Sequence, residues 1–163
     1  MRRVLLPLLV VVSLCAVSVA AANTSHAGWP HIDGQLIMHK LDESGPITPV
    51  TTNRHNELLG GHGNDTITAG NAGDVIWGDY KPSGQPTTQN DVLQGGAGRD
   101  FIYASHGHNT IDTGGGNDVV HAHFGSGSIT CHSPGTIVYL SHKSRRGYQL
   151  NGCARISYKT LGY

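Results

Sequence analysis

A period of nine residues runs through the middle of this sequence and constrains its fold more than any other feature. Two stretches show the period almost completely, GGHGNDTIT at 60–68 and GGAGRDFIY at 95–103. Both read G-G-x-G-x-D-x-(apolar)-x, a nonapeptide typical of stacked β-helical coils. With Asp as the sixth position, the period predicts repeats from His55 to Tyr139, broken only by an eight-residue insertion between Asp74 and Asp91.

The eighth position of every repeat is aliphatic, although only 37% of the chain is hydrophobic. These positions are Leu58, Ile67, Ile76, Leu93, Ile102, Ile111, Val120, Ile129 and Val138. Glycines allow six residues to form a tight turn, and the next three form a short strand whose middle side chain points inward. One coil cannot bury its aliphatic residue, but stacked coils can. The sequence therefore predicts an all-β solenoid with a narrow aliphatic core.

These residues resemble the hemolysin-type, or RTX, calcium-binding repeats. The resemblance implies a parallel β-roll in which one nonapeptide makes half a coil, so that alternate repeats stack on the same side. It also implies calcium ions between stacked turns, held by glycine carbonyls and by the Asp side chains of two successive turns. Such a set suits Ca²⁺, which takes six to eight oxygen ligands. One expected column contains Asn56, Asp74, Asp100, Asp118 and Thr136, and the other contains Asp65, Asp91, Asn109 and Gly127.

This stacking predicts where calcium binds. Sites with a carboxylate from both turns are expected at Asp74/Asp100, Asp100/Asp118 and Asp65/Asp91. A fourth and weaker site is expected at Asp91/Asn109, which has one carboxylate. The glycines expected to contribute to these turns are Gly60, Gly61, Gly63, Gly95, Gly96, Gly98, Gly114 and Gly116. We therefore expect calcium as the cofactor, with about three ions.

The outward strand positions predict two different faces. One sheet presents mainly polar side chains such as Thr66 and Thr110. The other presents an apolar and aromatic row that includes Trp77, Phe101, Tyr103 and Tyr139. A patch of this size needs a cover or a partner. We expect the insertion or the C-terminal tail to lie across it; the competing hypothesis is a ligand or dimer surface.

The flanking segments predict the organisation of the chain. Residues 1–27 have the basic start, apolar run and small residues of a secretory signal peptide, with cleavage between 20 and 27. Residues 28–54 and 140–163 are expected to cap the repeats at 55–139, and the insertion at 78–90 is expected to be a surface loop. In an oxidising compartment, Cys131 and Cys153 predict a disulfide.

Composition and motifs narrow the function. Lys and Arg balance Asp and Glu at 11 each, so bulk charge predicts no nucleic-acid or membrane partner, and no membrane span is expected. The sequence lacks H-E-x-x-H, G-x-S-x-G and a P-loop, so an enzyme is not predicted. The sequence predicts a secreted calcium-binding protein with a structural or interaction role. The alternative is a carbohydrate- or cell-surface-binding module that uses Trp77, Tyr103 and Tyr139.

Overall fold

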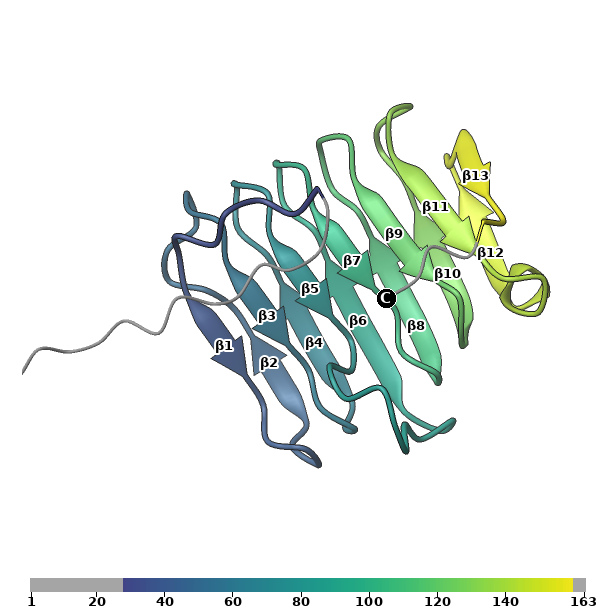
Figure 1. The fold of residues 1–163 in the computed structure, drawn as a ribbon, viewed down its shortest axis with the longest axis horizontal. Helices are drawn as coiled ribbons and strands as arrows, with labels where there is room; N and C mark the ends of the chain where they lie inside the picture. The colour runs from purple at the N-terminus through teal and green to yellow at the C-terminus, as the bar shows by residue number, and fades with distance from the viewer. Residues whose placement is uncertain (1–27, 160–163) are drawn as a thin grey trace, which may run out of the picture.

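The computed structural model describes residues 28–159 as a solenoid of two parallel sheets (Figure 1). Successive strands alternate between the sheets, so every second strand joins the same one. One sheet has seven strands in the order β1-β3-β5-β7-β9-β11-β13, and the other has six in the order β2-β4-β6-β8-β10-β12. Every strand pairing in the described part of the chain is parallel. The predicted all-β class and parallel solenoid are confirmed.

The strands are short, as the nonapeptide predicts. The seven-stranded sheet contains β1 (Leu36–Met38), β3 (Glu57–Leu59), β5 (Val75–Trp77), β7 (Phe101–Tyr103), β9 (Val119–Ala122), β11 (Ile137–Leu140) and β13 (Arg155–Ser157). The six-stranded sheet contains β2 (Gly45–Ile47), β4 (Asp65–Thr68), β6 (Asn90–Gln94), β8 (His108–Asp112), β10 (Ser126–Thr130) and β12 (Tyr148–Asn151). A short 3-10 helix, η1 (Ser144–Arg146), lies between β11 and β12.

The eighth-position residues form the core between the sheets. All nine are at most 1% exposed. They also pair in register along each sheet, as Ile76, Ile102 and Val120 do. Each fully buried aliphatic side chain contributes ~1.5–3 kcal/mol, so the coils are held together by a continuous apolar row.

The apolar row continues beyond the predicted repeats at both ends. The end strands add the pairs Ile37–Leu58, Ile47–Ile67, Ile129–Leu150 and Val138–Ile156. Strands β1 and β2 both lie in the segment expected to cap the repeats, and no periodic pattern in the sequence predicts β2. Gly45 and Pro46 disfavour a strand, and Pro46 is tolerated because β2 is at the edge of its sheet. The flanking segments thus continue the solenoid with less regular coils.

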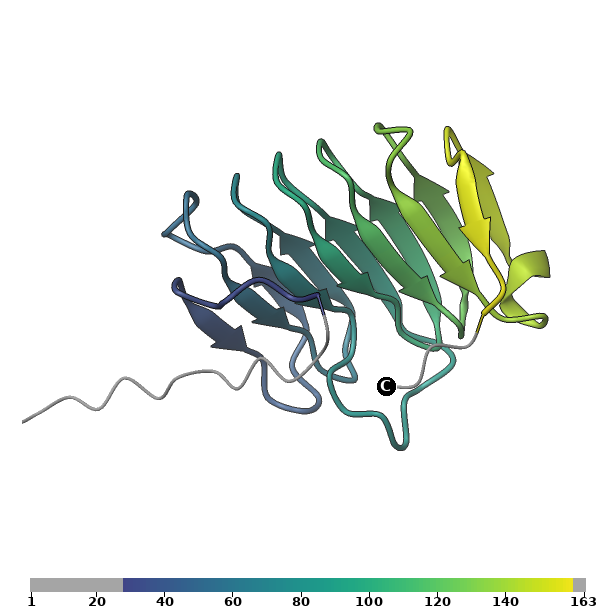
Figure 2. The same cartoon turned by 45° about the horizontal axis from the view of Figure 1, so that its top comes forward.

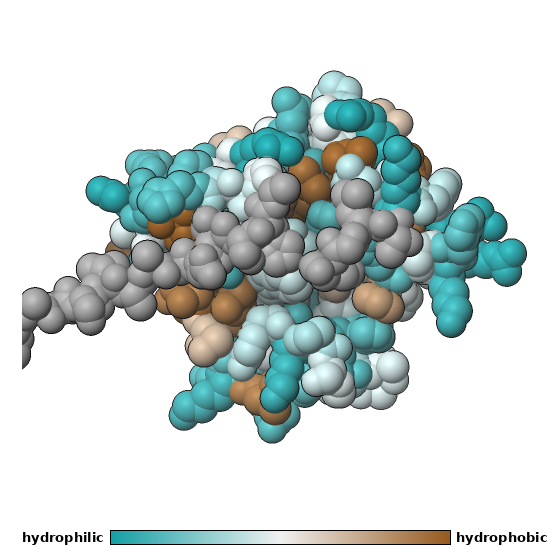
Figure 3. All heavy atoms as spheres, viewed as in Figure 1, coloured by the Kyte–Doolittle hydropathy of each residue, from teal (hydrophilic) through white to brown (hydrophobic). Residues whose placement is uncertain are grey.

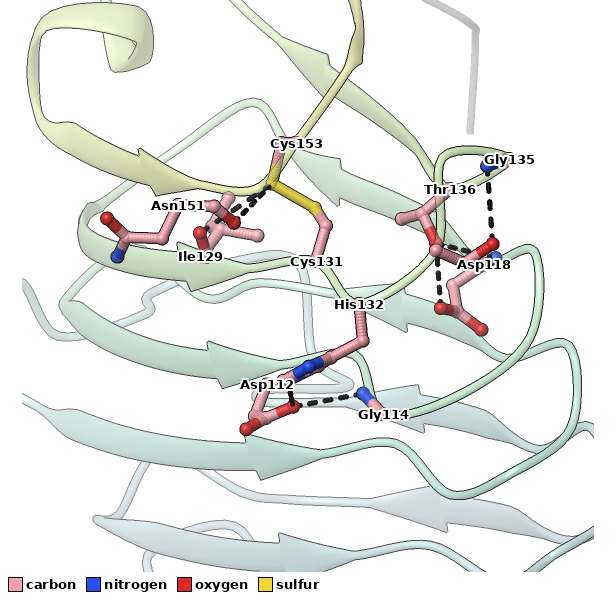
Figure 4. The surroundings of a disulfide bond; sticks show 11 residues. Asp112, Gly114, Asp118, Ile129, Cys131, His132, Gly135, Thr136, Asn151 and Cys153 are labelled. Carbon is pink, nitrogen blue, oxygen red and sulfur yellow. Dashed lines mark hydrogen bonds and ion pairs between the residues drawn. A yellow bond between two sulfur atoms is a disulfide. The ribbon is translucent and has the colours of Figure 1, made fainter.

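The predicted disulfide is present between Cys131 and Cys153 (Figure 4). Cys131 directly follows β10, and Cys153 lies two residues after β12. The predicted signal peptide at 1–27 and the last four residues, 160–163, lie outside the described residues. Within residues 28–159, no helix has the length and apolar character needed to cross a membrane.

Part of the aromatic face is covered by the N-terminal segment, which we did not expect to lie there. Phe101 and Tyr103 are buried, and Trp29 and Ile32 of the N-terminal segment pack against them. The Trp29 indole N–H donates a hydrogen bond of 2.8 Å to the Tyr103 hydroxyl. The sequence did not predict this contact because Trp29 stands between Gly28 and Pro30 and outside any periodic segment.

The outward aromatic rings form a stack along the seven-stranded sheet. The ring centroids of Trp77 and Tyr103 lie 4.0 Å apart, those of Tyr103 and His121 4.6 Å, and those of His121 and Tyr139 5.1 Å. Trp77 and Tyr139 are half-buried. In Figure 3, separate apolar patches lie among hydrophilic side chains on the visible face. The repeats therefore build both an inner aliphatic row and an outer aromatic row.

Candidate metal centre

The turns of the solenoid lie along two opposite edges (Figure 2). One edge carries the turns that enter the odd-numbered strands, and we call its sixth-position residues the Asp100 column: Asn56, Asp74, Asp100, Asp118 and Thr136. The other edge carries the turns that enter the even-numbered strands, and we call its sixth-position residues the Asp91 column: Asp65, Asp91, Asn109 and Gly127. The strand register places the members of each column one above the next.

Backbone hydrogen bonds connect the side chains of the Asp100 column into a ladder. The N–H of Asp74 donates to the Asp100 carboxylate at 2.7 Å, and the N–H of Asp100 donates to the Asp118 carboxylate at 3.0 Å. The second carboxylate oxygen accepts from the second residue of its own turn. These donors are Gly70 to Asp74 at 2.6 Å and Gly96 to Asp100 at 2.9 Å. One carboxylate therefore fixes its own turn and links it to the turn before.

Neutral side chains end the ladder on both sides. The backbone N–H and the side-chain amide of Asn56 donate to Asp74 at 2.5 and 2.9 Å. At the other end, the Thr136 hydroxyl donates to the Asp118 carboxylate at 2.9 Å (Figure 4). The Asp100 column thus has three carboxylates and two gaps with a carboxylate on each side, as expected.

These three carboxylates are fully buried. Burial raises the pKa of Asp74 and Asp118 above the ordinary value. It raises the pKa of Asp100 to about 7, and the neighbouring carboxylates of Asp118 and Asp74 add to the effect. None of the ion pairs within residues 28–159 involves these three groups. Because a buried charge without a partner is unfavourable, the column suits a cation.

Backbone carbonyls of the glycine turns point toward the next turn of the column. A Cβ atom on Gly96 would lie 1.4 Å from the Gly70 carbonyl oxygen, and one on Gly114 would lie 2.2 Å from the Gly96 carbonyl oxygen. One on Gly116 would lie 2.0 Å from the carbonyl oxygen of Gly98. A carboxylate has about four acceptor positions, so the two N–H donors leave capacity for a metal. Carboxylates and carbonyls are the hard oxygen ligands that calcium prefers.

The side chains of the Asp91 column form hydrogen bonds largely with other polar side chains. Asp91 accepts from the N–H of Asp65 at 2.9 Å and from the Ser105 hydroxyl at 2.5 Å. His39 Nδ1 lies 2.7 Å from a carboxylate oxygen of Asp65. The Asn109 side-chain oxygen accepts from the Ser105 backbone N–H at 3.1 Å, and its amide nitrogen donates to the Tyr148 hydroxyl at 3.0 Å. Asp65 and Asp91 are therefore adjacent, as expected. The side chains of Asp91 and Asn109 are instead linked by hydrogen bonds that Ser105 makes with both.

The glycines of this column also have a different setting. A Cβ on Gly61 or Gly63 would lie 2.5 Å or less from carbonyl oxygens of the turn at 40–43. Burial raises the pKa of Asp91 to about 6; the Ser105 hydroxyl opposes the rise, and the carboxylates of Asp65 and Asp79 add to it. The pKa of Asp65 is also raised by burial, with His39 opposing the rise.

Sequence reasoning missed the side chains that surround the Asp91 column. His39, His62, Asp79, Gln89 and Ser105 lie outside the sixth position of any repeat, and only the insertion marked this part of the chain as unusual. Burial raises the pKa of Asp79 to about 6, against the N–H of Lys81 and the nearby His62. Within residues 28–159, no three His, Cys, Asp or Glu side chains converge closely enough to hold a metal by themselves. Carbonyl or amide oxygens must therefore complete any site.

The comparison with known protein families agrees with this geometry. Residues 50–79 and 87–120 match the family described as the RTX calcium-binding nonapeptide repeat, in four copies. The unmatched residues between the two segments, 80–86, belong to the insertion. No curated protein and no solved structure matches the chain. This chain therefore carries RTX calcium-binding nonapeptide repeats.

Proposed function

We propose that this is a secreted protein in which calcium, bound between the stacked turns, stabilises the β-roll for a structural or interaction role. One observation carries the proposal. Asp74, Asp100 and Asp118 form a buried ladder between glycine turns and make no ion pair with any of residues 28–159. A divalent cation would neutralise these charges, and the adjacent carbonyls would complete its oxygen shell.

We propose about three ions. Two would lie in the gaps of the Asp100 column, between Asp74 and Asp100 and between Asp100 and Asp118. The third would lie between Asp65 and Asp91 in the other column. A fourth, between Asp91 and Asn109, would be weaker because it has one carboxylate and because Ser105 already bonds to both side chains.

Calcium would act on folding rather than on catalysis. The carboxylates of a column come together only when the coils stack, so the binding energy of the metal adds to the stability of the fold. Extracellular calcium modules bind at ~10⁻⁴–10⁻³ M, a range in which the roll would fold after export. Export itself rests on the signal peptide predicted at residues 1–27.

The test is calcium titration of the secreted protein after chelation, followed by circular dichroism and calorimetry. Added calcium should increase the β signal and bind with a stoichiometry of about three. The proposal fails if the chelated protein is equally folded and takes up no calcium.

A second candidate function is recognition of a carbohydrate or cell surface through the aromatic face. A cavity of about 410 Å³ favours it, lined by aromatic and polar side chains that include Trp77, Tyr80, Tyr103, His106 and Phe124. Aromatic rings with polar neighbours are typical of ligand sites. Pull-down on cell-wall glycans in calcium should be lost on Tyr80→Ala or Trp77→Ala. Equal retention of these variants and the native protein, or no retention at all, counts against this candidate.

A further inference from the structure

The insertion begins in place of a glycine turn. A Cβ on Gly60 would lie 2.2 Å from the carbonyl oxygen of Gly78, so Gly78 stacks on Gly60 and takes the first position of the next turn in the Asp91 column. The N–H of Tyr80 donates to the Gly60 carbonyl at 3.1 Å. Asp79 therefore stands at the second position, which is glycine in the turn before.

The insertion ends with a second replacement. Gln89 stands two residues before Asp91, as Gly63 stands two residues before Asp65. It also keeps the stacking of that position, because a Cβ on Gly107 would lie 2.0 Å from the Gln89 carbonyl oxygen. The preceding turn has glycine at both of these positions, whereas the insertion has Asp79 and Gln89, whose side chains carry oxygen atoms that can bind a metal.

Both side chains turn inward although the middle of the insertion is exposed. Asp79 and Gln89 are each 3% exposed, whereas residues 81–84 are exposed to solvent. The Gln89 amide nitrogen lies 3.4 Å from the Asp91 carboxylate, and the Gln89 side chain also contacts Asp79. The amide therefore lies between two carboxylates that belong to the two ends of the inserted turn.

Two buried oxygens in this cluster lack hydrogen-bond donors among residues 28–159. They are Oδ2 of Asp79 and Oε1 of Gln89. The nearest cationic group to Asp79 is His62, whose Nε2 lies 3.4 Å from Oδ2 and also makes no hydrogen bond in the described part of the chain. Buried polar atoms normally find partners, so oxygens left unsatisfied beside a second carboxylate point to a ligand.

We propose that the insertion builds a divalent-cation site, with Asp79, Gln89 and Asp91 as oxygen ligands and calcium as the cation. The proposal rests on the calcium role proposed above and deepens it, since two of the ligands come from outside the nonapeptide pattern. Two carboxylates and an amide oxygen are a ligand set that calcium accepts. The Gly60 turn stacks against the insertion, so this site is the gap between Asp65 and Asp91 in which the third ion is proposed.

The test compares Asp79→Asn with Asp42→Asn in the full chain, by calorimetric titration with calcium. Asp42 is an exposed acid in the turn that precedes β2, so its replacement controls for overall charge. Asp79→Asn should bind one ion fewer than the native protein, or bind one ion at least ~10-fold more weakly, the range seen when groups around a metal are removed. Asp42→Asn should bind as the native protein does. The proposal is overturned if Asp79→Asn keeps the native stoichiometry and affinity.

A second variant, Gln89→Glu, decides the question if Asp79→Asn does not fold. A carboxylate in place of the amide should lower the melting temperature of the chelated protein and strengthen one calcium site. A variant that is destabilised equally with and without calcium would refute a metal role for this position. If the native protein takes up no calcium, the general proposal fails as well. If the native protein binds calcium and both Asp79→Asn and Gln89→Glu bind it with the same stoichiometry and affinity, only the proposed insertion site fails.

Discussion

The carboxylate of Asp100 accepts a hydrogen bond of 2.7 Å from the backbone N–H of Asp74, one coil earlier in the roll. The N–H of Asp100 donates in the same manner to Asp118. Among the buried carboxylates of its column, Asp100 alone has another carboxylate in the turn on each side, because the column ends in Asn56 and Thr136. Both proposed gaps of the column therefore share Asp100.

Replacing the shared carboxylate should affect two ions. Asp100→Asn keeps the size of the side chain but removes its charge from both gaps, so we expect the loss of two calcium ions from the native stoichiometry. Asp118→Asn is the matched comparison, because it borders only one gap between carboxylates and should lose one ion. Calorimetric titration of the two variants distinguishes these outcomes, and an equal loss in both would contradict the shared role.

The stability of the calcium-free protein should fall as the pH rises. An acid that is salt-bridged in the folded state has the opposite effect, because its lowered pKa makes the protein more stable as the pH rises. The pKa values of Asp100, Asp79 and Asp91 are raised to about 7, 6 and 6 in the folded protein, against ~4 in an unfolded chain. The folded state therefore binds more protons, and its stability is fully present below pH ~4 and is lost as the pH rises through 6 and 7. Calcium should offset this loss, because it binds the ionised carboxylates.

Melting temperatures measured from pH 5 to pH 8, in chelator and in calcium, test this dependence. The chelated protein should melt at progressively lower temperature as the pH rises, and the difference between the two series should widen. A chelated protein as stable at pH 8 as at pH 5 would show that the buried carboxylates keep ordinary pKa values.

The fold was predictable because its core is built from one aliphatic side chain in every nine residues. Residues such as Ile76 and Ile102 recur at a fixed position, and a strict period of this kind has one simple solution, parallel coils stacked in register. The less regular end coils were harder. Strand β2 contains Gly45 and Pro46, and only its pairing with β4 shows that Ile47 continues the core.

The candidate site was predictable where its ligands follow the repeat. The stacking of Asp74, Asp100 and Asp118 follows directly from the period. The surroundings of Asp91 were not predictable, because Ser105 and Gln89 reach it from turns that do not keep the glycine pattern. Similarly, the cover over Tyr103 depends on Trp29, a tertiary contact between residues 74 positions apart.

Two glycines of the Asp100 edge should respond very differently to the same substitution. A Cβ on Gly96 would lie 1.4 Å from the carbonyl oxygen of Gly70, whereas one on Gly115 meets nothing closer than 3.4 Å. Gly96→Ala should therefore force the turns apart and cost ~1–3 kcal/mol or more, while Gly115→Ala should leave stability nearly unchanged. Chemical denaturation in saturating calcium measures both, and equal stability of the two variants would mean that the turns stack less closely.

The disulfide should stabilise the C-terminal coils locally. Cys131 and Cys153 are 22 residues apart and join the turn after β10 to the turn after β12, where the Cys131 N–H also donates to the Asn151 carbonyl. Closing a loop of this length contributes ~2–4 kcal/mol. We expect the double variant Cys131→Ala/Cys153→Ala to lose about this much stability.

The loss should be confined to the strands that the disulfide holds. In calcium, amide hydrogen exchange of the double variant should increase in β12 and β13, which end the two sheets. Exchange in β5 and β7 should stay unchanged, because the core row and the Asp100 column hold those strands independently. Increased exchange along the whole roll would mean instead that the coils unfold as one cooperative unit, since a local opening cannot expose strands at the centre of both sheets.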